Sequence, residues 1–397
     1  MLPPRINFYS APAANISNWT TRFLKPRWDL RCDPRTLKVE AKAGVSVFKT
    51  WDDPLAALQW MSTAFAEDNG KWFGHINYDF GRLLEPGWGN QNVPADDLNI
   101  PLFHFTYCTP VGERIYAPEP TYSTSDVPLR STFSREAYEK AVARCIEYIA
   151  AGDVFQINLS QRFTVGLPVQ PAYLHQFLVQ QLPSHYGAYL SYGDYCIVSN
   201  SPELFIEVDT DRSVKTRPIK GTRPLGEGMA EELGNSAKDA AELNMIVDLE
   251  RNDLGRICEI GSVRVTQPRA IEAHPTVYHG VATIEGKLRD DVSFLDILRA
   301  TFPGGSVTGA PKIRAMQIID ELEPFRRGPY CGAIGWLGKN GSMAFNLAIR
   351  TMTIKDGLAH IPVGGGIVAD SNPAAEFDET IVKASAMFRA LGIETSS

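Results

Sequence analysis

The order of apolar patterns along the chain is the feature that most constrains its fold. Several strand-like segments follow one another with no helical pattern between them, first over residues 189–208 and again over residues 332–363. A doubly wound parallel sheet needs strands in strict alternation with helices, and this chain lacks that alternation. We therefore predict an α+β fold with mainly antiparallel β-sheets.

The individual elements follow from the same patterns. Strands are predicted at 72–78, 155–163, 189–192, 195–199, 204–208, 263–266, 278–286, 332–338, 343–351 and 359–363. Helices are predicted at 54–61, 236–250, 293–301, 312–323 and 374–391, with one more between an N-cap at Ser134 and a stop at Gly152. In strand 155–163 apolar and polar residues alternate, so we expect one face to be buried and the other exposed.

Composition excludes several classes of function. The chain has 397 residues, 44% of them hydrophobic, and can therefore bury a large core. Its net charge of −7 argues against nucleic-acid binding, which usually needs a basic face. We find no apolar run long enough to span a membrane, no signal-peptide layout, and six widely spaced cysteines that favour reduced thiols. A soluble, cytoplasmic protein is expected.

One segment is a candidate boundary within the chain. Residues 117–131 are rich in proline, serine and threonine, which is typical of a linker or a long crossing loop. This segment separates an N-terminal part, residues 1–125, from a larger part, residues 130–392. We expect the two parts to be interleaved.

The segment Thr216–Pro224 places a lysine on a stiff backbone. Pro218 and Pro224 favour extended geometry on either side of Lys220 and Gly221. Such a lysine can be an ordinary solvated side chain on a turn, as most lysines are. Alternatively, its amine is held in a pocket and acts as a nucleophile once a proton is removed.

Two predicted helices carry acidic residues on one face. Asp239 and Glu242 are three residues apart on the first helix, and Glu376, Glu379 and Lys383 share a face of the second. A capping box at the start of the first helix and a Glu379–Lys383 salt bridge on the second would also explain these residues. From the helices alone, both interpretations stay open.

Three consecutive glycines, Gly364–Gly366, stand just upstream of the second acidic helix. Glycine leaves backbone N–H groups accessible at close range, and a helix that begins at Asn372 and Pro373 favours anions at its N-terminus. An anion site beside several carboxylates is chemically consistent if a divalent cation lies between them. Mg²⁺ prefers such a set of carboxylates, waters and an anionic ligand.

A second glycine-rich segment, Gly304–Lys312, does not match a phosphate-binding loop. A Walker sequence requires Gly-Lys-Ser/Thr, whereas Gly309 is followed here by alanine, proline and lysine. We interpret the segment as a turn that leads into a helix begun by Pro311 and that can still help to bind a carboxylate. Arg350 can hold a carboxylate in a bidentate fork, although a structural ion pair is an equally ordinary role for it.

These segments together resemble the chorismate-utilising enzymes, which include the anthranilate, aminodeoxychorismate, isochorismate and salicylate synthases. The resemblance runs over residues 130–392, and its most specific stretches are Asn244–Leu254, Gly304–Lys312 and Gly364–Lys383. Residues 1–125, which contain Phe73–Asp79, resemble the more variable N-terminal part of the family. The resemblance implies the anthranilate synthase component I-like fold, in which antiparallel sheets pack as a sandwich with flanking helices.

The resemblance also implies roles for individual residues. Mg²⁺ is expected to bind chiefly to Glu242 and Glu379, with Asp239 and Glu376 close by or bound through water. The family usually has glutamate at the position of Asp239, so direct ligation by this shorter side chain is less secure. His279 matches the histidine near the ring hydroxyl of chorismate. Contacts to chorismate are expected from Tyr330, Arg350, Gly364, Gly366, Lys383, Thr222 and Ser306.

Two positions distinguish the branches of the family. Gln156 stands where the water-adding synthases have a lysine base, and glutamine cannot act as a base. Anthranilate synthases typically have alanine where this chain has Lys220, and Pro218–Thr222 resembles the aminodeoxychorismate synthases instead. The resemblance implies that Lys220 attacks C2 of chorismate, that the 4-hydroxyl departs, and that ammonia then displaces the lysine at C4. Glu203 resembles the residue that moves protons in these steps.

The source of ammonia lies outside this chain in that interpretation. No nucleophilic cysteine with a glycine elbow is present, so we expect a separate glutamine amidotransferase subunit as partner. No Leu-Leu-Glu-Ser motif occurs near Phe23–Pro26, so feedback inhibition by tryptophan is not supported. The alternatives are anthranilate synthase component I and a catalytically silent chorismate-binding partner.

Overall fold

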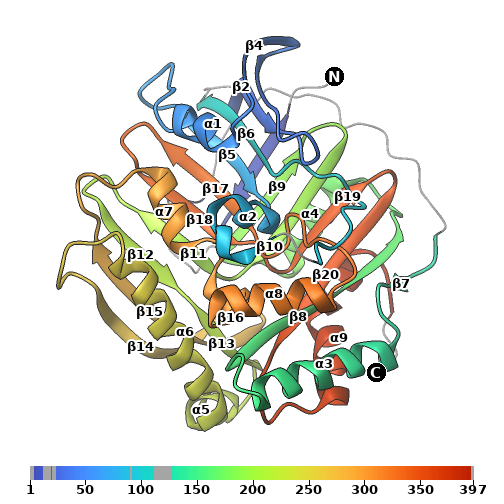
Figure 1. Cartoon of the computed structure of the whole chain (residues 1–397). Helices are drawn as coiled ribbons and strands as arrows, with labels where there is room; N and C mark the ends of the chain where they lie inside the picture. The colour runs from blue at the N-terminus through green and yellow to red at the C-terminus, as the bar shows by residue number, and fades with distance from the viewer. Residues whose placement is uncertain (1–3, 12–18, 20–23, 90–91, 111–126, 395–397) are drawn as a thin grey trace.

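The structure is a computed structural model that describes residues 4–11, 19, 24–89, 92–110 and 127–394. Within these residues, two antiparallel β-sheets of eight and twelve strands form the centre of the molecule, and helices flank them (Figure 1). The predicted α+β class with antiparallel sheets is therefore confirmed.

The bounds and order of the strands are as follows. The first sheet runs β1 (Arg5–Tyr9), β9 (Tyr186–Ser191), β10 (Tyr195–Ser201), β19 (Thr351–Lys355), β20 (Leu358–Ile367), β8 (Gln156–Gly166) and β16 (Gly309–Ala310), with β7 (Arg130–Ser131) beside β8. The second sheet runs β13 (Ile219–Pro224), β15 (Val277–Lys287), β12 (Ser213–Arg217), β11 (Leu204–Val208), β18 (Met343–Leu347), β17 (Ala333–Gly338), β5 (Lys71–Ile76), β6 (Phe103–Pro110), β2 (Leu24–Cys32), β3 (Val39–Ala43) and β4 (Ser46–Trp51), with β14 (Arg264–Ala273) beside β15.

The helices cover the outer faces and edges of the sheets. They are α1 (Pro54–Met61), α2 (Gly81–Leu84), α3 (Arg135–Ala150), α4 (Pro171–Gln181), α5 (Met229–Asn235), α6 (Ala237–Gly255), α7 (Phe294–Thr301), α8 (Lys312–Leu322) and α9 (Pro373–Ala390). α3 and α9 lie side by side against β8 and β20, whereas α6 packs on β13, β14 and β15 (Figure 1). None of the helices in the described part of the chain is long and apolar enough to cross a membrane.

The two sheets pack face to face through a shared apolar core. Phe8 and Leu190 from the first sheet are buried in the same cluster as Phe73 and Trp336 from the second sheet. Each large apolar side chain removed from water in this way stabilises the fold by roughly 1.5–3 kcal/mol. The expected sandwich of antiparallel sheets is therefore present.

Strands from the start of the chain are built into both sheets. β1 pairs with β9 in the first sheet, and β5 lies between β6 and β17 in the second, with Gly74 opposite Gly335. A Cβ atom at Gly74 would lie 2.0 Å from the carbonyl oxygen of His104, so this close approach requires glycine. Most of the linker predicted at 117–131 lies outside the described residues.

The predicted helix signals act as expected. The hydroxyl of Ser134 accepts a hydrogen bond from the N–H of Ala137, and the amide oxygen of Asn372 accepts one from the N–H of Ala375. These side chains satisfy backbone donors that have no partner within the first turn. The predicted strand 72–78 and the six predicted helices are present, whereas α2, α4 and α5 were not predicted.

Two strand predictions were wrong in instructive ways. β8 was expected to expose one face, but its polar residues are buried, because they face the glycine strand β20 and the side chain of Glu323. The strand predicted at 343–351 is two strands, β18 and β19, which belong to different sheets. Between them Arg350 has a φ of 48°, in the left-handed region, where the chain crosses from one sheet to the other.

A buried ion pair fastens the loop after α8 to the first sheet. Arg327 donates to Glu323 at 2.6 Å and also to the carbonyl oxygens of Asn158 and Val307. Glu323 in turn accepts hydrogen bonds from the N–H and the hydroxyl of Ser160. Both carboxylate oxygens of Glu323 and all three guanidinium nitrogens of Arg327 therefore have hydrogen-bond partners, which offsets the cost of burying two charges.

We expect Arg327→Met to lower the free energy of unfolding by about 3–5 kcal/mol, because Glu323 would keep a buried charge without its partner. Urea unfolding followed by circular dichroism measures this change. The control, Arg251→Ala, breaks an exposed pair with Asp248 and should change stability by less than about 1 kcal/mol. Equal effects of the two substitutions would show that the pair does not fasten the loop.

Candidate active site

The amine of Lys220 lies where the two sheets approach each other. Lys220 is on β13 of the second sheet, opposite Gly280 of β15, and its side chain is only partly exposed. A Cβ atom at Gly366, on β20 of the first sheet, would lie 3.3 Å from the Nζ of Lys220. Lys220 is therefore on a strand and points across the interior, so the interpretation as an ordinary solvated lysine on a turn is wrong.

The backbone on both sides of Lys220 directs the side chain inward. Gly221 has a φ of 81° and forms an irregularity in the pairing of β13 with β15. The backbone before and after Gly221 is extended, which agrees with the effect expected of Pro218 and Pro224. A Cβ atom at Gly221 would meet the side chain of Asp239 at 2.9 Å, so the irregularity also lets α6 approach.

The surroundings of Lys220 favour its neutral form. Burial lowers the pKa of Lys220 below its usual range, and the positive charge of Lys383 lowers it further. The carboxylates of Glu242 and Glu203 oppose this change. An amine with a depressed pKa is a better nucleophile at neutral pH, because more of it is unprotonated.

Glu203 lies in the loop that leads into β11 and is buried close to Lys220. Burial raises the pKa of Glu203 to about 7, against the opposing effects of a hydrogen bond from Ser306 and the charge of Lys220. The hydroxyl of Ser306 donates to the Oε1 of Glu203 at 2.7 Å. A carboxyl group with this pKa can both donate and accept a proton near neutral pH.

The glycine run lies at the C-terminal end of strand β20, and carboxylates from α9 face it. A Cβ atom at Gly365 would lie 3.2 Å from the Oε2 of Glu376, 3.7 Å from the Nζ of Lys383 and 3.9 Å from the Oε1 of Glu379. The ammonium of Lys383 contacts Glu379 at 2.6 Å and donates to the carbonyl oxygen of Gly364 at 3.0 Å. The three glycines therefore belong to a strand, and charged groups of α9 approach them closely.

The acidic residues of α6 are less tightly gathered. Glu242 lies 4.0 Å from Lys238, and the carboxylate of Asp239 forms an ion pair with Arg223 at 3.3 Å. Among the described residues, no three His, Cys, Asp or Glu side chains are gathered closely enough to hold a metal by themselves. Mg²⁺ commonly uses only one or two carboxylates together with waters and a ligand oxygen. Glu242 and Glu379 fit such a site, since within the described part of the chain their ion pairs are with Lys238 and Lys383, which a metal ion can displace. Glu376 lies beside Glu379 at Gly365.

His279 faces the interior from β15 as a neutral imidazole. Its Nδ1 lies 2.9 Å from the hydroxyl of Thr222, and its buried Nε2 has no partner among the described residues. Burial lowers the pKa of His279 to about 3, and the charge of Arg350 contributes. The unpaired Nε2 can therefore exchange a hydrogen bond with a bound molecule.

Arg350 provides a positive charge without a fixed partner. Burial lowers its pKa, whereas the charge of Glu203 raises it, and we find no hydrogen bond or ion pair from its guanidinium in the described part of the chain. The structural ion pair that the sequence left open is therefore not formed. An unpaired guanidinium is suited to a carboxylate ligand.

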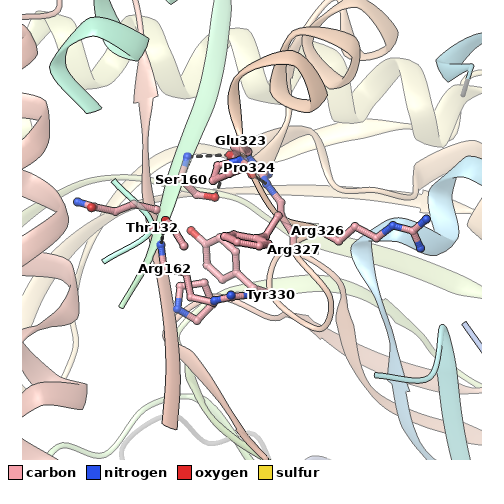
Figure 2. Close-up of a pocket in the computed structure, with 11 residues that line it drawn as sticks. Thr132, Ser160, Arg162, Glu323, Pro324, Arg326, Arg327 and Tyr330 are labelled. Carbon is pink, nitrogen blue, oxygen red and sulfur yellow. Dashed lines mark hydrogen bonds and ion pairs between the residues drawn. The ribbon is translucent and has the colours of Figure 1, made fainter. Parts of the chain in front are cut away.

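Tyr330 is buried on the segment that pairs with the chain just before Arg350, because the N–H of Cys331 donates to the carbonyl oxygen of Ala348 at 3.0 Å. It lines a small pocket together with Ser160, Arg162, Glu323 and Arg327. Figure 2 shows the ring of Tyr330 directed into this pocket, while the side chain of Arg326 extends away from it.

On β8, sequence reasoning used Gln156 only to set aside the water-adding branch and missed Asn158. Both amide atoms of Gln156 and the amide oxygen of Asn158 are buried without partners in the described structure. A Cβ atom at Gly366 would lie 2.7 Å from the Nε2 of Gln156, and one at Gly364 would lie 3.1 Å from the Oδ1 of Asn158. The alternation along residues 156–160 was the available signal, because it places these side chains on one face of the strand.

Comparisons with known proteins agree with this arrangement. The model of the chorismate binding enzyme family matches residues 38–389, and the chain therefore belongs to this family. Among solved structures, anthranilate synthase component I from Streptococcus pneumoniae aligns with a TM-score of 0.79 and 29% identity, over 98% of this chain and 93% of that chain.

Two kinds of relative are similar in sequence. Aminodeoxychorismate synthase component 1 of Bacillus subtilis is 37% identical over an alignment of 411 positions, which covers 89% of this chain and 87% of that protein. Anthranilate synthase component 1 of Pseudomonas aeruginosa is 46% identical over 274 residues, which cover 68% of this chain. That match spans only 56% of the Pseudomonas protein, so this chain covers little more than half of its length.

We expect Gly366→Ala to reduce turnover of chorismate by about 100-fold, because the added Cβ would displace Lys220 and Gln156 from their positions. Steady-state consumption of chorismate measures the effect, and thermal unfolding checks that the protein still folds. Gly255→Ala at the end of α6 is the control, since a Cβ there meets nothing within 4 Å. Wild-type turnover in Gly366→Ala would show that the close approach has no part in the reaction.

Proposed function

We propose that this protein is the chorismate-aminating component of aminodeoxychorismate synthase, which forms 4-amino-4-deoxychorismate for 4-aminobenzoate and folate synthesis. The observation that carries the proposal is the amine of Lys220, which is held over Gly366 with a lowered pKa and lies close to Glu203. The similarity to aminodeoxychorismate synthase component 1 of B. subtilis along most of both chains supports the same conclusion.

Lys220 and Glu203 can carry the covalent steps without an outside proton donor. The neutral amine attacks C2 of chorismate, and the 4-hydroxyl leaves as water with a proton from Glu203. Glu203 then takes one proton from the nitrogen of the adduct. Ammonia attacks C4, and the nitrogen of Lys220 leaves C2 and takes that proton back from Glu203. Glu203 then takes a proton from the ammonium group formed at C4.

The remaining polar groups are suited to holding the substrate. We assign the unpaired guanidinium of Arg350 and the ammonium of Lys383 to the carboxylates of chorismate. The neutral His279 and the amide of Gln156 can form hydrogen bonds to its polar groups. Gly364 and Gly366 allow the ring to approach the backbone, whereas Thr222 and Ser306 support His279 and Glu203.

Mg²⁺ is the cofactor that these residues fit best. Glu242 and Glu379 would hold it, with Glu376 close by, and Asp239 would act through water, since it pairs with Arg223. When bound, the ion polarises the ring carboxylate of chorismate as a Lewis acid. Ammonia would come from a glutamine amidotransferase partner, or from added ammonium in its absence.

Anthranilate synthase is the competing function. Its support is the higher local identity, 46%, to the enzyme of P. aeruginosa over 274 residues. The presence of a lysine amine in place of an inert side chain at position 220 favours amination at C4 over amination at C2. The two functions differ in their product and are therefore separable by one measurement.

With chorismate, Mg²⁺ and ammonium, we expect a product that an added lyase converts to 4-aminobenzoate, identified by mass spectrometry. Lys220→Ala should reduce its formation by about 100-fold or more, because the nucleophile is lost. Lys215→Ala, on β12 of the same sheet and in an ion pair with Glu207, is the control. Formation of fluorescent anthranilate instead would assign the protein to the competing function.

A second prediction concerns the metal. We expect Glu379→Gln to raise the Mg²⁺ concentration needed for half-maximal turnover by at least about tenfold, since a carboxylate ligand becomes neutral. Asp378→Asn, on the same helix but exposed and paired with Arg135, should leave that concentration unchanged. Full turnover after exhaustive chelation would remove Mg²⁺ from the account.

A further inference from the structure

We propose that His274 is a positioning residue that holds the imidazole of His279 in one orientation for the reaction. This inference rests on the proposed function, in which the neutral His279 forms a hydrogen bond to chorismate. His274 lies in the turn between β14 and β15, and no step of the reaction above uses it. In this role it acts through His279 and does not touch the substrate.

His274 is the middle member of a column of three buried imidazole rings. Its ring stacks on that of His185, with 3.9 Å between the ring centroids and 26° between the ring planes. It also packs against the ring of His279 at 4.6 Å and 84°, which is nearly perpendicular. Each of the three side chains is at most 8% exposed. Stacked and perpendicular arrangements are those that aromatic rings prefer.

The column crosses from one sheet to the other. His185 directly precedes β9 of the first sheet, whereas His279 is on β15 of the second. The turn that carries His274 is closed by a hydrogen bond from its own N–H to the carbonyl oxygen of Val277 at 2.8 Å. His274 is therefore fixed both by its turn and by a ring from the opposite sheet.

The hydrogen bonds of His279 define its tautomer but hold its ring at one nitrogen. Nδ1 of His279 lies 2.9 Å from the hydroxyl of Thr222 and 3.4 Å from the carbonyl oxygen of Gly221. A carbonyl oxygen can only accept, so Nδ1 carries the hydrogen and the unpaired Nε2 is an acceptor. Rotation about the last side-chain bond of a histidine has only broad minima. The ring therefore needs a second contact, and the perpendicular ring of His274 supplies it.

The rings of the column are uncharged. Burial, the neighbouring imidazoles and the charge of Arg350 lower the pKa of His274 to about 2. Burial lowers the pKa of His185 to about 4. The Nε2 of His274 has no hydrogen-bond partner in the described part of the chain. His274 therefore contacts His279 as a neutral ring, through packing and not through transfer of a proton.

A double-mutant cycle tests whether His274 acts through His279. We expect His274→Ala to lower kcat for chorismate about tenfold with little change in KM, because His279 stays present but loses its orientation. In the His279→Ala background the same substitution should lower kcat by less than about twofold, since the residue that it positions is gone. An equal loss in both backgrounds would overturn the proposal.

Two further variants separate ring packing from other effects. His274→Phe keeps an aromatic ring without nitrogen atoms and should hold kcat within about twofold of the wild type. His175→Ala is the control, because it removes a similarly buried ring that stacks on Tyr189 at α4 and should leave kcat unchanged. A His274→Phe protein as slow as His274→Ala would overturn positioning by packing.

Nuclear magnetic resonance of the ring nitrogens gives a readout that does not depend on turnover. Without substrate, we expect His279 to show a single Nδ1–H tautomer in the wild type and in His274→Phe, and an average of both tautomers in His274→Ala. A single tautomer in His274→Ala would overturn the proposal. The expected tautomers together with formation of anthranilate would overturn the proposed function and leave the positioning of His279 intact.

Discussion

The close approach of Lys220 to Gly366 is the constraint on which the rest of the site depends. Lys220 belongs to one sheet and Gly366 to the other, so the two residues stay close only while the two sheets keep their relative position. The apolar core between the sheets maintains that position, and the buried pair of Arg327 and Glu323 fixes the loop beside β8. Stability and chemistry in this protein therefore share the same contacts.

Burial also sets the protonation states of Lys220 and Glu203. Burial pushes Lys220 towards its neutral form and Glu203 towards its protonated form, which is the opposite of an ordinary lysine–glutamate salt bridge. The cost of burying these groups is offset by hydrogen bonds such as that from Ser306 to Glu203. In the proposed function, these two side chains are the nucleophile and the acid, and both are in place before substrate arrives, as covalent catalysis requires.

Local sequence signals predicted much of this fold and some of the site. Capping residues such as Ser134 and Asn372 marked helix starts, and apolar periodicity identified the helices that carry Glu242 and Glu379. The crossing at Arg350 was not predictable, because an apolar run does not reveal that its two halves enter different sheets. The approach of Gly366 to Lys220 was likewise hidden, since the two residues are distant in sequence and meet only in the folded protein.

The most direct test of the account is to look for the bond that Lys220 is proposed to form. The protein is incubated with chorismate and Mg²⁺ but without any source of ammonia, and its intact mass is then measured. The account predicts a gain equal to one chorismate less one water, located by peptide mapping at Lys220 and absent from Lys220→Ala. An unmodified Lys220 in protein that still aminates chorismate at C4 would contradict it.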